Sequence, residues 1–323
     1  MGGESCNILV PLLPNKCWTV SQIISIGPML REEIRREKLG LIGMAFQLAS
    51  FTFEFFGRIA KIDKAVFPNS FGFSTNLYEK GQLKRILANC ATLKTKYKDC
   101  AIIIKSINLE NFDYKSLTKY KHLPTRIIFY SNDIMAKVSP RSDTKSDNAE
   151  FENSGLKWAQ YNGAIEAAKL KRIIALYRQL YLEKYSTYNP DYSEEYLLSL
   201  LKRRIINFKC LENSGGEILG FCTYYSTNTE LCSPMIGYDE SYKSAPIYRI
   251  IMNEAANVAL LANKSLNHSA GAAKYKSNRG FTPLVEYMLI IDDHLPWWRR
   301  LGYTIISEVF KKFEKQLLKA VIS

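Results

Sequence analysis

The stretch "INFKCLENSGGEILGFCTYYS", residues 206–226, decides the fold class. Two runs rich in apolar and aromatic residues, 206–212 and 217–226, flank the tetrapeptide Asn-Ser-Gly-Gly at 213–216. Strand-like runs separated by a few turn-forming residues that include glycine are typical of a β-hairpin. We therefore expect the two runs to pair as antiparallel strands.

Working outward from this hairpin, strands and helices alternate. We expect strands at 231–238, 265–271 and 282–291, and helices at 157–185, 246–263, 272–278 and about 297–320. In the first of these helices, apolar residues recur at spacings of three and four, which gives one apolar face. Pro190 ends that region, and Ser193 followed by two glutamates marks the start of another helix. This order predicts a mixed α/β fold with a central sheet.

The first part of the chain has a similar mixture of elements. Helical signals run through 28–60 and 79–96, an extended segment covers 64–78, and apolar runs at 100–107 and 123–131 predict strands. The segment "KVSPRSDTKSDNAEFENSG", 137–155, is polar and predicts a linker. The sequence thus predicts an N-terminal domain over 1–136 and a C-terminal domain over 156–323.

The charge of the chain is strongly basic. Among 323 residues, 44 Lys and Arg exceed 31 Asp and Glu, which gives a formal net charge of +13. Such a charge attracts polyanions, for example nucleic acid, anionic lipid or an acidic carrier protein, although a generally lysine-rich composition explains it equally well. No run of five Lys or Arg residues occurs, so a dedicated nucleic-acid-binding tail is not indicated.

Cysteine usage and the N-terminus indicate a cytoplasmic protein. The seven cysteines form no C-x-x-C pair and have no metal-ligand spacing with the three histidines, so reduced thiols and no metal site are expected. The first residues lack the positive segment of a signal peptide. The apolar stretch 39–60 contains Glu54 and Arg58, so we interpret it as a buried helix and expect no membrane span.

The segment "LNHSAGAAKYKSNRGFTPLVEYML", 266–289, combines small residues with cations. Lys276 and Arg279 are three residues apart, so one helical turn places them on one face, and Glu286 on the next strand could pair with either. One interpretation is a structural salt bridge beneath a strand crossing. The other is a cationic pocket for a carboxylate, a phosphate or a carbonyl oxyanion, with Ser269 and Tyr287 beside it.

Two further stretches are candidates for ligand binding. The turn "EKYSTYNPDY", 183–192, is polar and lined by aromatic residues, so Tyr185 and Asn189 are candidate wall residues, although a packed tyrosine stripe is the alternative. Tyr238 and Asp239 lie where a strand ends before a helix, a natural place for anions, yet the acidic residues there would repel a diphosphate. Asp239 either caps a turn or meets an ammonium group.

Several motifs resemble one known group of proteins. The motifs are "LYRQLYLEKYSTYNP", "SPMIGYDES", "NHSAGAAKYKSNRGFTPLVEY" and "DHLPWWRR" in the second half, and "FSTNLY", "AIIIKSINLENF" and "LPTRIIFYSND" in the first. In this order they resemble bacterial proteins with tandem GNAT-type acyltransferase domains, which are related to the Fem-type aminoacyltransferases. The resemblance implies two tandem GNAT-like domains, each with a mixed central sheet flanked by helices. Because the first half lacks an equivalent of Lys276, Arg279 and Glu286, we expect it to be a scaffold or partner-docking half and the second half to carry the active site.

The resemblance also implies transfer of an acyl or aminoacyl group to a small-molecule amine. In such folds two central strands splay apart around the substrate, and "LCSPMIGYD" and "SLNHSAG" would border that gap. The usual R/Q-x-x-G-x-G/A loop for acetyl-CoA is replaced by "YDESYKSAPIY". This departure favours aminoacyl-tRNA or a carrier-bound acyl thioester as donor, with no tightly bound cofactor. A conventional acyl-CoA N-acyltransferase and a catalytically silent binding module remain alternatives.

The implied roles follow the chemistry of aminolysis. Lys276 and Arg279 would bind the oxyanion or an acceptor carboxylate, and Tyr238, Asp239 or Glu286 would bind or deprotonate the ammonium group. His294 would serve either as a base or as a turn residue held by a neighbouring aspartate.

Overall fold

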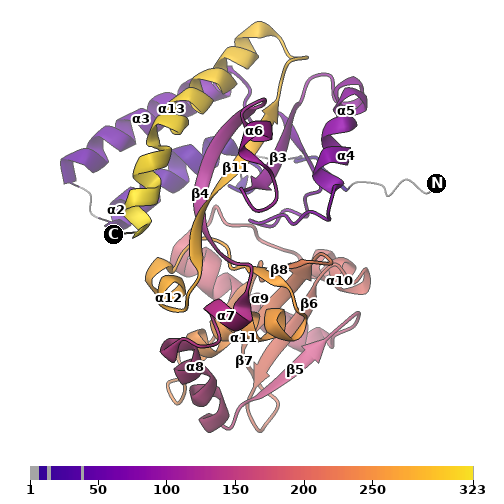
Figure 1. The fold of residues 1–323 in the computed structure, drawn as a ribbon, viewed down its shortest axis with the longest axis vertical. Helices are drawn as coiled ribbons and strands as arrows, with labels where there is room; N and C mark the ends of the chain where they lie inside the picture. The colour runs from indigo at the N-terminus through magenta and orange to yellow at the C-terminus, as the bar shows by residue number, and fades with distance from the viewer. Residues whose placement is uncertain (1–6, 13–15, 38–39, 323) are drawn as a thin grey trace. The chain divides into compact units, whose positions relative to one another are not determined.

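The computed structural model describes residues 7–12, 16–37 and 40–322, and the chain forms two compact units (Figure 1). Unit 1 comprises residues 1–126, 186–190 and 285–320, and unit 2 comprises 127–185, 191–284 and 321–323. The chain passes from one unit to the other within strands β4 and β11, because their residues are divided between the two. Each unit is therefore assembled from segments that are distant in sequence.

Unit 1 has a sheet covered by helices. Its elements are β1 (Ile8–Leu9), α1 (Gln22–Ile24), the π-helical η2 (Ser25–Met29), α2 (Leu30–Glu37), α3 (Gly40–Ile59), β2 (Ala65–Pro68), α4 (Gln82–Ala88), α5 (Cys90–Lys96), β3 (Ala101–Ile107), α6 (Tyr114–Leu117), the start of β4 (Lys121–Ser131), most of β11 (Thr282–Ile291) and α13 (Trp297–Ile322).

The sheet of unit 1 is mixed. Strand β2 pairs antiparallel with β1 and parallel with β3, and β3 pairs antiparallel with β11. Alternate residues of β2, β3 and β11 point to one face, where Phe67, Ile103 and Ile290 pack with Tyr303 and Ile306 of α13. The buried side of α13 thus packs on the sheet, and together they form the core of unit 1.

Unit 2 contains the hairpin and the alternating elements that follow it. Its elements are the end of β4, α7 (Ile134–Lys137), α8 (Ser142–Asn153), β5 (Lys157–Tyr161), α9 (Ala167–Arg178), the π-helical η3 (Gln179–Tyr185), α10 (Glu194–Lys202), β6 (Asn207–Glu212), β7 (Ile218–Ser226), β8 (Glu230–Cys232), β9 (Ile236–Tyr238), α11 (Ile247–Leu261), β10 (Ser265–Asn267) and α12 (Ala273–Asn278).

The sheet of unit 2 is also mixed. Strands β5, β6 and β7 form antiparallel pairs, and β7 then pairs with β8 near its end and with β9 near its start. Strand β10 runs parallel to β8 and antiparallel to β4. The parallel pair is created by the crossover through α11, since the chain leaves β9, passes through this helix and returns in β10.

Two glycines let helices approach both faces of this sheet. A Cβ on Gly237 would lie 2.9 Å from the carbonyl carbon of Leu176 in α9, and a Cβ on Gly220 would lie 2.4 Å from Ile251 Cδ1 in α11. Because Gly220 pairs with Tyr238 while Gly237 pairs with Phe221, the two glycines belong to opposite faces. Helices α9 and α11 therefore cover opposite faces of the sheet.

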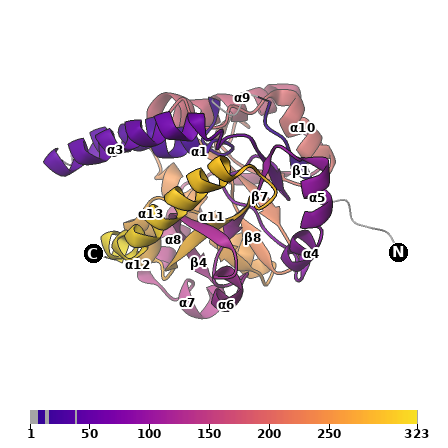
Figure 2. The same cartoon turned by 90° about the horizontal axis from the view of Figure 1, so that it is seen from above.

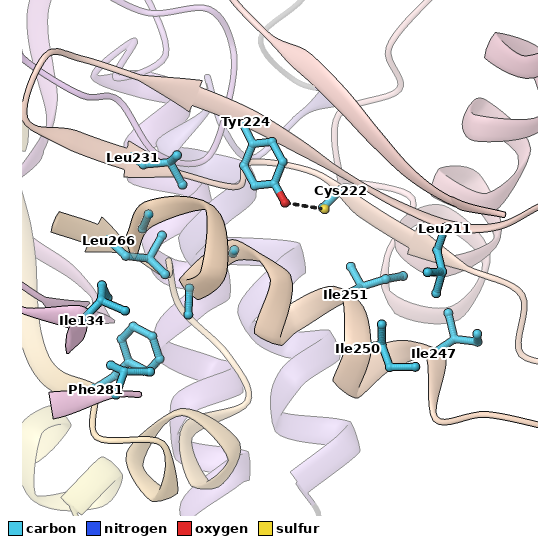
Figure 3. Packing of buried hydrophobic residues seen from close by; sticks show 14 of the residues in the cluster. Ile134, Leu211, Cys222, Tyr224, Leu231, Ile247, Ile250, Ile251, Leu266 and Phe281 are labelled. Carbon is cyan, nitrogen blue, oxygen red and sulfur yellow. Dashed lines mark hydrogen bonds between the residues drawn. The ribbon is translucent and has the colours of Figure 1, made fainter. Parts of the chain in front are cut away.

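An apolar cluster of unit 2 lies between α11 and the strands. Figure 3 shows Ile247, Ile250 and Ile251 of α11 together with Leu211 and Leu266 of the sheet, all of which are buried. The three isoleucines recur at spacings of three and four residues, so they form one stripe that faces the sheet. Burial of this stripe holds α11, and with it the β8–β10 crossover, in place.

Most of the predicted elements are confirmed. The hairpin is formed by β6 and β7 in antiparallel register, and the expected strand 282–291 coincides with β11. The expected strands at 100–107 and 123–131 correspond to β3 and β4, and the helix expected at 246–263 corresponds to α11. The mixed α/β class, with sheets flanked by helices, is confirmed as well.

Two predictions for the middle of the chain are corrected. The predicted linker 137–155 contains helix α8, in which Thr144 and Asp147 are buried within unit 2, and the division between the units lies elsewhere. The predicted helix 157–185 begins instead with strand β5, which pairs with β6, and its helical part starts only at Ala167. Both segments are stabilised by partners distant in sequence, which local periodicity does not reveal.

The interpretation of 39–60 as a buried helix is wrong for one face. Helix α3 forms as expected, yet apolar side chains such as Leu48, Phe55 and Ile59 are exposed by 70%, 62% and 55%. Within the described residues, no helix combines the length and apolarity needed to cross a membrane.

Candidate functional site

Two neighbouring strands of unit 2 separate at their carboxyl ends. Strands β8 and β10 stay in parallel register as far as Cys232 and Asn267. Beyond this point β9 continues against β7, whereas His268 donates its N–H to Phe129 O of β4 at 2.8 Å. We call residues 233–235 and 268–270 the strand divergence. Ligands of α/β proteins commonly bind where neighbouring strands part at their carboxyl ends.

The strand divergence contains two polar side-chain atoms that are buried and have no hydrogen-bond partner among the described residues. They are Ser233 Oγ and His268 Nε2, and each belongs to the residue that directly follows the last paired residue of its strand. A buried polar group without a partner costs free energy, so each such atom requires an explanation. A substrate that supplies the missing partners is one explanation.

His268 is held as a neutral imidazole. Burial, and secondly the nearby Lys276 ammonium, hold the pKa of His268 well below its ordinary value. The Met252 carbonyl accepts a hydrogen bond from the ring, and because Nε2 has no partner, the donor is Nδ1. Nε2 therefore carries a free lone pair, and the ring is fixed on its other side by Phe281, whose centroid is 4.9 Å away.

Lys276 binds the backbone of the strand divergence. Its side chain is buried, and Nζ donates to the carbonyl oxygens of His268, Ser269 and Ala270 at 2.6, 3.1 and 2.9 Å. Ser269 adopts a left-handed conformation with φ of 57°, which costs free energy for a residue with a side chain. An ammonium group has three protons, so these carbonyls occupy its donors. The geometry therefore favours a positioning role for Lys276 over direct binding of an oxyanion.

Arg279 is part of a buried ionic network. Its Nε donates to Asp147 Oδ2 at 2.6 Å, while Arg249 Nε donates to Asp147 Oδ1 at 2.6 Å. The Tyr275 hydroxyl also donates to Asp147 Oδ2 at 3.0 Å, and its ring lies 3.5 Å from the guanidinium carbon of Arg279. The Asp147 side chain is fully buried. This network joins α8 to α11 and α12, so it favours the structural interpretation of Arg279.

Four tyrosines gather near the strand divergence. Tyr181 and Tyr185 of η3 have ring centroids 6.2 Å apart, and Tyr238 of β9 and Tyr248 of α11 have centroids 5.6 Å apart. Burial raises the pKa of Tyr181, and the hydroxyls of the other three tyrosines raise it further, so the four lie close together. The Ile236 N–H of β9 donates to the Tyr181 hydroxyl.

This tyrosine cluster consists of two predicted residues, Tyr185 and Tyr238, and two that were not predicted as binding residues. Burial also raises the pKa of Tyr248 to about 12, so its hydroxyl is protonated at neutral pH. Tyr185 is 46% exposed, which makes it the open edge of the cluster. Tyr248 was missed because only the tertiary fold brings α11 beside β9, and no local pattern in the sequence signals this.

The acidic residues after β9 are paired with cations. Asp239 accepts from Arg172 at 2.7 Å and from the Ser241 N–H at 2.9 Å, and Glu240 forms an ion pair with Lys184. The hydrogen bond from Ser241, together with Arg172, lowers the pKa of the Asp239 carboxyl. Asp239 therefore caps a turn, and the expected repulsion of an anion at this place is reduced.

The other predicted site residues belong to unit 1. Glu286 is buried and accepts from Arg126 Nε at 2.7 Å, so its expected pairing with Lys276 or Arg279 is corrected. Asn189 accepts from Trp18 Nε1 at 2.8 Å, and the Tyr287 hydroxyl donates to Glu314. Each of these three side chains is thus committed to a contact inside unit 1.

His294 lies in the turn after β11, also in unit 1. Its ring Nε2 lies 2.9 Å from the carbonyl oxygen of Cys100, and Nδ1 lies 3.9 Å from Asp293 Oδ1. This agrees with the interpretation of His294 as a turn residue. In the described part of the chain, His, Cys, Asp and Glu side chains form no group of three or more that could hold a metal ion.

Lys105 is a buried cation of unit 1 that the sequence analysis did not single out. Its Nζ donates to Thr19 O at 2.7 Å and lies 5.8 Å from the Trp18 ring centroid. Burial, and secondly the positive charge of Arg126, lower the pKa of Lys105 to about 8. The ammonium group is therefore costly to bury while it is charged.

This cost predicts a pH dependence of stability. Below pH 8 both the folded and the unfolded chain hold the proton, whereas between pH 8 and the ordinary value of 10.5 only the unfolded chain does. The unfolding free energy of the protein should therefore rise with pH in this window, relative to the Lys105→Met variant, by at most about 1.4 kcal/mol per pH unit. Urea unfolding of both proteins below and above pH 8 measures this difference. If the unfolding free energies of the two proteins change with pH in the same way, burial does not lower the pKa of Lys105.

Comparison with known proteins places the fold. Neither a family model nor a curated protein sequence matches the chain. Many solved structures match the chain, and three of them illustrate the similarity. L-PGS from Bacillus licheniformis is 12% identical with a TM-score of 0.51, and the match covers 76% of this chain and 83% of that chain.

The second is the C-terminal domain of a putative lysylphosphatidylglycerol synthetase from Agrobacterium fabrum, 8% identical, with a TM-score of 0.51 and coverage of 76% of this chain and 82% of that chain. The third is FemX, which is also 8% identical with a TM-score of 0.52. The match covers 76% of this chain and 84% of FemX. The chain therefore shares the fold of FemX and the L-PGS proteins, as its resemblance to the Fem-related group implies.

Proposed function

We propose that this protein transfers an acyl or aminoacyl group from an activated donor to an amine, and that the strand divergence of unit 2 is the reaction site. The proposal rests on two buried polar atoms, Ser233 Oγ and His268 Nε2, which lie at the ends of two separating strands and have no hydrogen-bond partner in the described part of the chain. The fold shared with FemX and L-PGS supports a transferase at the level of architecture.

The proposed reaction is aminolysis of an ester or thioester. The amine nitrogen bonds to the acyl carbon, the bond from that carbon to the leaving oxygen or sulfur breaks, and the proton lost by the amine ends on the leaving group. His268 Nε2 accepts the proton after the amine nitrogen has bonded to the acyl carbon and become positively charged, and it passes this proton to the leaving group; a neutral imidazole with a lone pair that meets no described residue can act in this way. The Ser233 hydroxyl donates a hydrogen bond to the developing oxyanion.

Other residues of unit 2 position these two groups. Lys276 holds the carbonyls of the strand divergence, and the network around Arg279 fixes α12 against α8. The tyrosine cluster supplies hydroxyls and ring faces for an aminoacyl or amine group, with Tyr185 at its open edge. An ammonium group is attracted to aromatic faces, so such a cluster suits this substrate class.

We propose a polyanionic donor, either aminoacyl-tRNA or a carrier-bound acyl thioester. The net charge of +13 favours association with polyanions, and the segment between β9 and α11 contains no glycine-rich phosphate loop. A conventional acyl-CoA donor is the second candidate. It is favoured by the pairing of Asp239 with Arg172 and of Glu240 with Lys184, which removes repulsion of a diphosphate.

A donor comparison tests the proposal. The protein is supplied with either labelled aminoacyl-tRNA or labelled acyl-CoA, with hydroxylamine as a small amine acceptor, and the labelled hydroxamate is quantified above the rate without protein. We expect faster formation from aminoacyl-tRNA, with donor affinity that falls steeply as salt rises, because counterions are released on binding. Transfer from acyl-CoA alone would support the second candidate. Transfer from neither of these, nor from a carrier-bound thioester, would refute the enzymatic function.

A further inference from the structure

Helix α3 of unit 1 exposes a stripe of apolar side chains. Met44, Leu48, Phe51, Phe55 and Ile59 follow one another at spacings of three and four residues, so they lie on one side of the helix. They are exposed by 65%, 70%, 54%, 62% and 55%, respectively. The opposite side is packed: Gly57 is buried, and a Cβ there would lie 3.3 Å from Ile23.

Helix α13 of the same unit has a comparable stripe. Trp297, Leu301, Ile305 and Val309 recur every four residues and are exposed by 73%, 49%, 55% and 45%. The other side of this helix packs on the sheet of unit 1 through Tyr303 and Ile306. We refer to the two stripes together as the apolar face of unit 1.

The two helices that form the apolar face are in contact. Figures 1 and 2 show α3 and α13 side by side, and Arg299 Nε donates to Ala60 O, just after α3, at 3.2 Å. A Cβ on Gly302 would lie 2.7 Å from the Ala60 Cβ, so glycine allows this close approach. Exposed apolar side chains concentrated on two adjoining helices indicate a surface that another body covers.

The charges on these helices identify the covering body. The exposed cation Lys61 follows the end of α3, and Arg300 and Lys312 are exposed on α13. The carboxylates described on the two helices are engaged: Glu54 pairs with both Arg31 and Arg58, Glu308 pairs with Lys311, and Glu314 accepts from Tyr287. Aromatic and aliphatic side chains flanked by Lys and Arg are the pattern of helices that lie on anionic lipid surfaces.

We propose that the apolar face of unit 1 docks on an anionic lipid surface. Trp297 and Trp298 at the start of α13 are exposed, and tryptophan prefers the boundary between headgroups and acyl chains. A second copy of the chain is the competing occupant, but two copies that each carry a net charge of +13 repel one another, whereas anionic lipid attracts both. The docking is peripheral and is independent of the proposed transfer reaction.

Vesicle sedimentation tests this proposal. The full chain is mixed with vesicles of phosphatidylcholine alone or of phosphatidylcholine and phosphatidylserine, and the bound fraction is measured. We expect binding to the anionic vesicles that weakens with salt. The double variant Phe55→Ser/Leu301→Ser should bind at least about tenfold more weakly, since each serine removes apolar area from the lipid contact. Both side chains are more than two-fifths exposed, so folding should be preserved, which circular dichroism checks.

Leu261→Ser is the matched control. Leu261 is 85% exposed at the end of α11 in unit 2, so this variant makes the same chemical change outside the apolar face and should bind as the unaltered protein does. The proposal is overturned if the unaltered protein ignores anionic vesicles or if the double variant binds equally well. It is also overturned if the double variant converts a dimer to a monomer while neither protein binds vesicles, because the face is then an interface between copies.

Discussion

Replacement of Asp147 by asparagine should lower the unfolding free energy by about 3–5 kcal/mol, because it leaves buried positive charge without its partner. The side chain of Arg279 is only 6% exposed, and its Nε donates to Asp147 Oδ2. Arg249 relies on the other oxygen of the same carboxylate. Asparagine has nearly the same shape, so the variant removes the charge while leaving the packing of α8 almost unchanged.

Asp143→Asn provides the matched control on the same helix. Asp143 Oδ2 lies 3.5 Å from Arg279 Nη1, and its side chain is 42% exposed, so water screens the pair. Its replacement should cost less than about 1 kcal/mol. Urea unfolding followed by circular dichroism gives both values from the midpoints, provided that the slopes agree. Equal losses for the two variants would mean that Asp147 does not hold α8, α11 and α12 together.

The prominence of Asp147 illustrates what the sequence does not reveal. Helix α8 was predicted to be a linker because it contains few apolar residues, and apolar periodicity is the main signal for a buried helix face. Its buried carboxylate Asp147 is instead paired with Arg249 and Arg279, and its half-buried Asn148 accepts from Asn253, all of them partners far along the chain. A polar face that is buried through distant ion pairs looks like a solvated segment in the sequence alone.

Strands and helices with apolar faces, by contrast, were predicted closely. Strand β11 and the β6–β7 hairpin combine apolar runs with turn residues, so their local sequences specify them. The α3 helix was also predicted, but its environment was not. Apolar periodicity predicts that one face will be covered, and it does not distinguish a protein core from another covering body.

The candidate site was predicted in part. The two segments expected to border the gap are neighbours in the sheet, since β8 and β10 pair in parallel register. Lys276 and Arg279 were grouped because a spacing of three residues suggests a shared face. The structure assigns them different partners, three backbone carbonyls and a buried aspartate. Backbone carbonyls that collect around an ammonium group depend on loop conformation, for which one sequence contains no signal.

His268→Asn should reduce the rate of transfer by about 10²-fold or more, the contribution expected of a positioned base. The asparagine side-chain nitrogen is as far from Cβ, in bonds, as Nδ1 of histidine, so it can still donate to the Met252 carbonyl. The substitution removes Nε2, the atom without a partner at the strand divergence. Donor affinity should change little, since the variant keeps the charge of the site.

The pH dependence of the reaction tests whether His268 is neutral throughout the assay range, and the variant tests whether it is the base. Because burial holds the pKa of His268 well below its ordinary value, the imidazole stays neutral as the pH falls through the usual histidine range. The rate per bound donor should therefore show no loss from His268 protonation near the ordinary value of 6.5. Steady-state rates across this range, with saturating donor, measure the effect. A variant that transfers at the original rate would exclude His268 as the base.

His294→Asn is the matched control, because it makes the same substitution at a second histidine whose ring has a buried nitrogen with no hydrogen bond to the described residues. Like His268 Nε2, His294 Nδ1 is buried and forms no hydrogen bond with any described residue, but it lies in unit 1, in the turn after β11. Its ring contacts the carbonyl of Cys100, so the variant should alter stability rather than transfer. If both variants lose transfer in proportion to their loss of folded protein, the strand divergence has no special role. A loss confined to His268→Asn at unchanged stability assigns the base to unit 2.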